Sequence, residues 1–194
     1  LSSTAGEYLQ ALSRYGIPAV CDRGGSLMDT SEVQILLSIL QIIDNPHQDV
    51  PLLTALASPV FGFTPDQLAA PRTENRQLDF YDLIRERPEF RTFLETLEGL
   101  RDDVRWMPLH ELVDSVFRRT GMLAVFAAMD DGVRRERNLM AFRSFLVSFE
   151  ASGSRTLPQL LWYLAQLQAG SGQLPIPKAA AENAVTIMTV HSSK

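Results

Sequence analysis

Residues 183–194 read Asn183-Ala184-Val185-Thr186-Ile187-Met188-Thr189-Val190-His191-Ser192-Ser193-Lys194, and this stretch decides the fold that the sequence predicts. The apolar, largely β-branched run that begins at Val185 predicts a buried strand of the kind found in parallel sheets. Polar side chains follow that run directly. Because binding groups collect beyond the carboxyl ends of parallel strands, we expect this polar tip to face a ligand.

A second short strand is predicted near the beginning of the chain. Residues 17–21 are apolar and partly β-branched, and they follow a helix predicted at residues 4–15 that stops at Gly16. We expect the strands at residues 17–21 and 185–190 to share one small sheet, although most of the chain lies between them.

Between these strands the pattern is almost wholly helical. A helix capped by Asp29 or Thr30 is expected to end at Asn45-Pro46. Thr64 and Thr156 each place a capping hydroxyl just ahead of a proline in a first helical turn. Helices are predicted at residues 50–57, 64–70, 80–85, 89–100, 109–120, 122–129, 134–151 and 157–167, and a linker at residues 170–178. The simplest arrangement that fits this order of elements is a small α/β lobe built from both chain ends and interrupted by an all-helical insertion.

Composition limits the classes of function. The chain has 194 residues, of which 45% are hydrophobic, so it can bury one sizeable core or two small ones. A net charge of −5 argues against a free-standing nucleic-acid binder, so any contact with DNA must be local. Cys21 is the only cysteine, which excludes an internal disulfide and fits a reducing cytoplasm. No apolar run is long enough to span a membrane. Leu1 in place of Met, together with the abrupt end, suggests a piece of a longer protein.

The sequence lacks the motifs of a self-contained enzyme. Its only Gly-Gly pair, Gly24-Gly25, is followed by Ser26-Leu27, so no phosphate-binding loop is present. The histidines, His47, His110 and His191, lie far apart, and no metal site is expected from their spacing. We therefore predict that the chain alone is catalytically inactive.

Residues 185–194 resemble motif V of superfamily 1 DNA helicases of the UvrD/Rep and AddA/RecB type, although the Gly-Leu-Glu-Phe that completes this motif does not follow. Other segments match in the same order along the chain. Glu7-Tyr8-Leu9 and Gly16-Ile17-Pro18 are similar to the helix and turn after motif IV. Ser58-Pro59-x-Phe61-Gly62 resembles the start of an inserted helical subdomain called 2B. The Ser-Pro-x-Phe-Gly form, with Arg135-x-Arg137-Asn138-Leu139 and Phe149-Glu150, favours AddA-type helicase-nuclease subunits over UvrD.

This resemblance implies a fold and a function. The fold would be mainly α with a small α/β part: residues 1–46 and 179–194 would form a partial second RecA-like lobe (2A), interrupted at residues 47–178 by an all-helical 2B-type insertion. The parent would be an ATP-dependent DNA helicase, with a nuclease, that tracks single-stranded DNA during double-strand break repair in the bacterial cytoplasm. It would use ATP and Mg²⁺, bind single-stranded and duplex DNA, and pair with an AddB-like subunit. The implied DNA-binding residues are Thr189, His191, Ser192 and Lys194.

Two alternatives stay open. The chain could be a helical protein-interaction module without DNA binding, and the polar strand end could be an ordinary structured turn. Five arginines could bind duplex DNA, but we favour a solvated helix face paired with neighbouring acids; these are Arg118, Arg119, Arg134, Arg135 and Arg137. Three aromatic residues are interpreted as core rather than as base-stacking platforms, namely Trp106, Trp162 and Tyr163, and Phe61 as a buried anchor of its turn.

Overall fold

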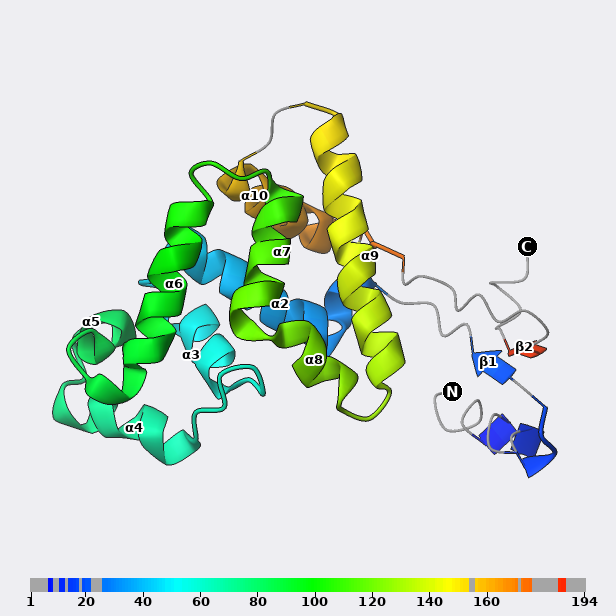
Figure 1. The fold of residues 1–194 in the computed structure, drawn as a ribbon, viewed down its shortest axis with the longest axis horizontal. Coiled ribbons are helices and arrows are strands. Elements are labelled where there is room, and N and C mark those ends of the chain that lie inside the picture. The colour runs from blue at the N-terminus through cyan, green and yellow to red at the C-terminus, as the bar shows by residue number, and fades with distance from the viewer. Residues whose placement is uncertain are drawn as a thin grey trace. The chain divides into compact units, whose positions relative to one another are not determined.

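The computed structural model describes residues 7–8, 11–12, 14–17, 19–21, 26–153, 156–170, 172–175 and 185–187, and these are mainly α-helical (Figure 1). The chain divides into two units. One is formed by both chain ends, Leu1–Ser26 and Leu174–Lys194, and the other by Leu27–Gln173 between them. The expected segments meet near residues 46 and 178, whereas these two units meet after Ser26 and after Gln173, so both boundaries lie earlier in the chain than expected.

The unit formed by the chain ends contains the only sheet within the described ranges. Strand β1 (Ala19–Cys21) pairs in parallel with β2 (Val185–Ile187), and Ala19 lies opposite Val185. An antiparallel bridge between Ser26 and Pro175 adds a second connection. The prediction that the two ends of the chain share one small sheet is therefore confirmed for the described residues of the two strands.

The other unit is a stack of helices joined by short turns. Its elements are η1 (Leu27–Asp29), α2 (Ser31–Asp44), α3 (Asp49–Ala57), α4 (Pro65–Glu74), α5 (Phe80–Ile84), η2 (Pro88–Phe90), α6 (Arg91–Asp103), α7 (Leu109–Thr120), α8 (Met122–Ala127), α9 (Gly132–Ala151) and α10 (Leu157–Ala169). Each helix predicted between residues 30 and 167 is confirmed, with end points that differ by a few residues.

Local signals in the sequence explain where these helices begin and end. Thr64 starts α4 with a reciprocal cap: its hydroxyl accepts from the backbone N–H of Gln67 at 3.3 Å, and its own N–H donates to Gln67 Oε1 at 2.9 Å. Gly121 ends α7 in the left-handed conformation, with φ of +66°, which a residue without Cβ adopts readily. The next helix, α8, then starts at once in a new direction.

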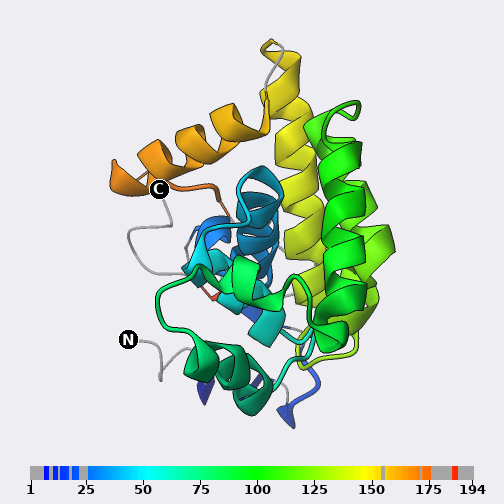
Figure 2. The same cartoon turned by 90° about the vertical axis from the view of Figure 1, so that its left-hand side faces the viewer.

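Helix α2 forms the centre of the helical unit. It contacts α3, α6, α9 and α10, and Figures 1 and 2 show these helices around it. Its buried side chains lie on several sides of the helix rather than on one stripe, among them Val33, Leu36, Ile39, Leu40, Ile42 and Ile43. Such a helix is stable only when neighbours cover it, so the unit is organised around α2.

A buried carboxylate joins the first turn of α2 to α9. Glu32 is 3% exposed, and its Oε2 accepts a hydrogen bond from Arg135 Nη1 at 2.9 Å, while its Oε1 accepts from Asn138 Nδ2 at 2.7 Å. Arg135 also donates to Ser31 Oγ at 2.8 Å. Burial of a charge is tolerated only when it is paired and hydrogen-bonded, so these contacts fix α2 against α9.

Replacement of Glu32 by Ala should lower the free energy of unfolding by about 3 kcal/mol, because Arg135 and Asn138 lose their partner in a largely buried setting. Urea unfolding followed by circular dichroism measures this change. Glu136→Ala, which removes an exposed acid of the same helix as Arg135, is the control and should stay within about 0.5 kcal/mol of the unaltered chain. Equal effects of the two substitutions would contradict the role given to Glu32.

A second ion pair joins α7 to α9. Arg143 donates from Nε to Asp114 Oδ1 at 2.6 Å and from Nη2 to Asp114 Oδ2 at 2.7 Å, which is the bidentate arrangement of guanidinium and carboxylate. The hydrogen bond from Arg143 lowers the pKa of Asp114 below its ordinary value. The ionised carboxylate is therefore the form that the fold stabilises.

Asp114→Asn should lower the free energy of unfolding near pH 7 by about 1 kcal/mol. Because the pKa of Asp114 is lower in the folded than in the unfolded chain, its stabilising effect is present above the unfolded value of about 3.9 and is lost as pH falls through the folded value. The difference between variant and parent should accordingly close below about pH 4. Urea titrations at stepped pH test this, with Asp102→Asn as a control at an exposed acid. A difference that does not depend on pH would disprove it.

Candidate functional site

The residues predicted to bind DNA, Thr189, His191, Ser192 and Lys194, lie outside the described residues. The structure describes the strand that precedes them in the sequence, β2, in which Ile187 pairs with Cys21 of β1. Since the two strands are parallel, their carboxyl ends meet at the same edge of the sheet. Contact of these four residues with single-stranded DNA stays a prediction.

Most of the arginines that could have formed a basic patch are engaged by acids. Arg119 donates to both carboxylate oxygens of Asp103, at 2.9 and 3.2 Å, and Arg134 lies 2.9 Å from Asp131. Arg135 is bound to Glu32. The interpretation as a solvated face paired with Asp130, Asp131 and Glu136 is therefore confirmed for Arg134; Arg119 and Arg135 are also paired, but with Asp103 and the buried Glu32, which were not the expected partners. Arg118 is exposed on α7, and Arg137 is partly buried.

The electrostatics of Asp103 show how firmly one such pair is held. Burial alone would raise the pKa of Asp103, but hydrogen bonds from Arg119 and from Ser115 Oγ, at 2.5 Å, outweigh burial and lower it. Asp103 thus stays ionised and keeps Arg119 on the surface of its own unit. That guanidinium is not free to neutralise a phosphate.

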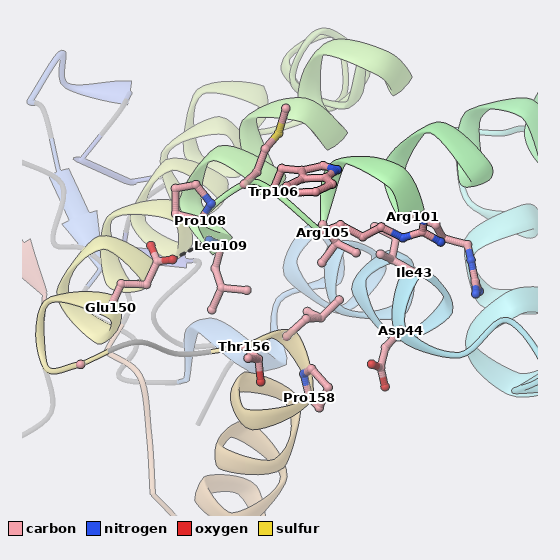
Figure 3. Close-up of a pocket in the computed structure, with 14 residues that line it drawn as sticks. Ile43, Asp44, Arg101, Arg105, Trp106, Pro108, Leu109, Glu150, Thr156 and Pro158 are labelled. Carbon is pink, nitrogen blue, oxygen red and sulfur yellow. Dashed lines mark hydrogen bonds between the residues drawn. The ribbon is translucent and has the colours of Figure 1, made fainter.

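A pocket of about 690 Å³ lies in the helical unit where several helix ends meet (Figure 3). The last residues of α2, α6 and α9 contribute to its lining, together with the first residues of α7 and α10. Figure 3 shows Arg101, Arg105 and Trp106 along one side of the pocket, with Asp44 and Pro158 across from them. We name this site the Trp106 pocket.

Trp106 is 87% exposed and Trp162 is 67% exposed, so the prediction that both are core residues is wrong. In α10 the buried positions are Leu157, Leu160 and Leu164, and a residue midway between the last two points to the opposite side of the helix. Trp106 lies in the connection between α6 and α7, after Leu100 has already supplied the last core residue of α6. Helical spacing alone does not show whether an apolar side chain of α10 faces the core or the solvent.

The other two aromatic predictions agree better with the structure. Tyr163 is partly buried and its ring centroid lies 5.1 Å from that of Phe149. Phe61 is partly buried and meets Phe93 edge to face at 4.9 Å. Both residues therefore pack within the unit, as expected.

Glu150 makes one wall of the Trp106 pocket rigid. Its Oε1 accepts from the backbone N–H of Leu109 at 2.5 Å, drawn as a dashed line in Figure 3, and its Oε2 lies 2.6 Å from His110 Nδ1. A carboxylate on α9 thereby caps the first turn of α7, where the helix dipole favours negative charge. The shape of the pocket is held by this contact.

The Trp106 pocket has the composition of a binding surface rather than of a catalytic centre. Trp, Arg and Met are enriched at the cores of protein interfaces, and an exposed indole can also stack on a base. Arg101 and Arg105 make only long contacts to acids of their own helix turn, 4.0 Å to Glu98 and 3.4 Å to Asp102. The guanidinium of Arg105 is mostly exposed and can turn toward a partner at small cost, whereas Nη1 of Arg101 is buried.

Within the part of the chain that the structure describes, no helix is long and apolar enough to cross a membrane.

No protein-family model matches the chain. The chain is 33% identical over 197 residues to the A subunit of the ATP-dependent helicase/nuclease of Thermoanaerobacter sp. (strain X514), an alignment that covers 96% of the chain and 16% of that protein. The protein of the same name from Desulforudis audaxviator is 36% identical over 200 residues, with 98% and 16% covered, and that from Geobacillus kaustophilus is 33% identical over 208 residues, with 99% and 17% covered.

The chain thus spans about a sixth of the length of these relatives. The resemblance to AddA-type proteins that the sequence motifs indicated is confirmed at this level. Homologous over nearly its whole length to these proteins, the chain belongs to the family formed by the A subunits of ATP-dependent helicase/nucleases.

Proposed function

We propose that the chain is the part of an AddA-like ATP-dependent DNA helicase that comprises a partial second RecA-like lobe and the helical 2B insertion, and that it tracks single-stranded DNA while the parent unwinds duplex DNA in double-strand break repair. The observation that carries this proposal is identity of 33–36% to helicase/nuclease A subunits over 94–99% of the chain.

The connectivity of the fold supports the assignment. Two strands from opposite ends of the chain pair in parallel, and parallel strands require a crossover connection between them. Here the crossover contains the whole helical unit, Leu27–Gln173. A sheet-containing lobe with a helical insertion has this connectivity. We assign the chain ends to lobe 2A and the helical unit to 2B, with α2 packed in the helical unit although it precedes residue 47.

The proposed DNA contact follows from the end of β2. Thr189, His191 and Ser192 come directly after a strand paired within the sheet, so their donors would be held at one edge of it. Hydroxyl and imidazole groups donate to phosphates without sequence preference, and Lys194 adds a positive charge. Such a site suits a protein that moves along DNA of any sequence.

The nucleotide site of the proposed parent lies mainly outside this chain. The sequence has no phosphate-binding loop, so its residues do not by themselves fit ATP with Mg²⁺. We propose that ATP binds between lobe 2A and a first RecA-like lobe, and that a nuclease domain and an AddB-like partner complete the assembly in the bacterial cytoplasm. The relatives are each one subunit of a helicase/nuclease, which supports both the partner and the nuclease.

Thr189→Ala and His191→Ala in the full-length protein should each weaken binding of single-stranded DNA about tenfold or more, since loss of one hydrogen bond to a charged group costs about 1.5–3 kcal/mol. DNA-stimulated ATP hydrolysis should fall with it. Fluorescence anisotropy with oligonucleotides of several sequences measures the affinity, and the loss should not depend on sequence.

The control for this experiment is Thr54→Ala, which alters an exposed threonine of α3. It should leave DNA affinity unchanged. If the Thr189 and His191 variants bind and translocate like the unaltered protein, the proposed contact is wrong and the strand end is an ordinary turn.

The Trp106 pocket favours a second function, the docking of a partner protein. An indole that is 87% exposed beside a concave surface, next to an arginine, Arg105, that is loosely paired with Asp102, is the arrangement of an interface hot spot. The acidic net charge of the chain and the carboxylates of Asp44 and Glu150 in the lining make a phosphate backbone a poorer ligand here than a protein. We assign the pocket to the AddB-like partner.

Trp106→Ala should weaken association with the AddB-like partner by about 2 kcal/mol, or roughly thirtyfold, as measured by surface plasmon resonance on the full-length proteins. Trp162→Ala is the matched control, because this residue is also an exposed tryptophan but does not line the pocket. Unchanged partner affinity with reduced DNA affinity would instead assign Trp106 to base stacking.

A further inference from the structure

Three potential metal ligands from separate segments converge on the surface of the helical unit. His47 lies in the turn between α2 and α3, Asp79 directly precedes α5, and Asp82 is in the first turn of α5. One ligand atom from each residue can be chosen so that all three lie within 4.8 Å of one another. His47 Nδ1 is 3.2 Å from Asp79 Oδ2 and 4.0 Å from Asp82 Oδ2.

We propose that His47, Asp79 and Asp82 bind a divalent transition-metal ion of borderline softness, with Zn²⁺ as its representative. An imidazole nitrogen and two carboxylate oxygens form a donor set that suits Zn²⁺ and related ions better than Mg²⁺ or Ca²⁺, which prefer oxygen ligands alone. The site is separate from the proposed DNA contact and from the proposed nucleotide site.

The spacing of the ligand atoms fits such an ion. Zn²⁺ binds nitrogen and carboxylate oxygen at about 2.0–2.2 Å, so two ligands of a tetrahedral ion lie roughly 3.3–3.6 Å apart. The distance between His47 Nδ1 and Asp79 Oδ2 is 3.2 Å, close to that value. Asp82 lies farther away, with its Oδ2 4.0 Å from His47 Nδ1, and its partly exposed side chain must rotate to bring the carboxylate within ligand distance of the same ion.

Electrostatics favour a cation at the point where the three side chains meet. The contact of 3.2 Å between His47 Nδ1 and Asp79 Oδ2 engages only the nearer of the two carboxylates. Asp82 is then left with Nδ1 at 4.0 Å and Arg85 Nη1 at 3.9 Å, both beyond hydrogen-bond distance. A divalent ion held by all three groups would neutralise both carboxylates at once, which a single proton cannot do.

Contacts that do not involve the ligand atoms hold the two ligand-bearing segments together. Asp49 at the start of α3 accepts a hydrogen bond from the backbone N–H of Phe80 at 2.8 Å. Arg72 bonds to the carboxylate of Asp49 and donates to the carbonyl of Leu78 at 2.6 Å.

Two further contacts fix the position of His47. Its backbone N–H donates to Asn45 Oδ1 at 3.1 Å, and its ring meets Tyr81 edge to face at 5.2 Å. An ion would therefore bind to side chains whose backbone is already ordered, which lowers the entropic cost of binding. The side chains of His47, Asp79 and Asp82 are 44%, 54% and 36% exposed, so water can fill the remaining coordination positions.

Zinc binding to the purified, tag-free chain tests the proposal. Isothermal titration with Zn²⁺ should show a site with one ion per chain, and His47→Ala and Asp82→Asn should each weaken that site at least tenfold. Co²⁺ should occupy the same site and give a d–d absorption band that Zn²⁺ abolishes, whereas an equal concentration of Mg²⁺ should not. Asp79→Asn should likewise weaken binding, and it preserves the size of a residue that precedes a helix.

Two controls separate this site from other histidines and acids of the chain. His110→Ala removes the histidine that contacts Glu150, and Asp102→Asn removes an exposed acid of α6; neither should change zinc affinity at the site. Circular dichroism of every variant confirms that the helices are retained. If the unaltered chain binds no zinc, or if His47→Ala and Asp82→Asn bind it as the unaltered chain does, the three residues are only an ion pair and its neighbour, and the proposal is overturned.

Discussion

The burial of helix α2 is the constraint on which the helical unit depends. Side chains on several of its faces are removed from water, and this is possible only because α3, α6, α9 and α10 lie against it. Burial of one leucine or isoleucine side chain contributes about 1.5–3 kcal/mol, so this helix carries a large share of the driving force for folding. The same burial removes Glu32 from water, and a carboxylate there requires the compensating contacts to Arg135 and Asn138. One helix thus supplies both the apolar core and a polar contact that selects how α9 packs.

The helices could be predicted from sequence because their signals are local. Capping threonines, prolines in first turns and Gly121 act within a few residues, and the observed boundaries follow them. The exposure of Trp162 could not be predicted in this way, because a tryptophan that follows two leucines in a helix fits an apolar pattern whichever way it points. Only the packing of α10 through Leu157, Leu160 and Leu164 decides that Trp162 faces solvent. The Glu32 contact joins positions more than 100 residues apart, and no periodicity reports such a pair.

At the candidate sites, one contact between residues far apart in the sequence could be predicted and two could not. The pairing of β1 with β2 was predicted from two short apolar runs and from the resemblance, although the paired residues lie at opposite ends of the chain. The convergence of His47 on Asp79 and Asp82 does not follow from the sequence, since histidine spacing indicates only those metal motifs in which the ligands are close in sequence. The Trp106 pocket was missed for a related reason, because its lining comes from five helices whose ends meet only in the folded unit. The sequence does contain one signal for this pocket. Trp106 follows Arg101 and Arg105 and precedes Pro108, which is not a typical core pattern.

The distribution of charge bears on where DNA can be held. Four arginines of the helical unit lie in ion pairs, namely Arg119, Arg134, Arg135 and Arg143. Hydrogen bonds from Arg119 and Arg143 lower the pKa values of Asp103 and Asp114. Three of these cations join different helices and Arg134 pairs with the residue that precedes its own helix; release of any of them to a phosphate would leave a carboxylate unpaired, which reduces the net gain from the new contact. In a chain with a net charge of −5, the helical unit is therefore poorly suited to act as an extended electrostatic platform for duplex DNA. A short group of neutral donors at the edge of a sheet does not depend on such a platform, because it gains affinity from directed hydrogen bonds to phosphates. This distribution of charge agrees with the proposed division of roles, in which the strand ends would contact the nucleic acid and the helical unit would present the Trp106 pocket to a protein.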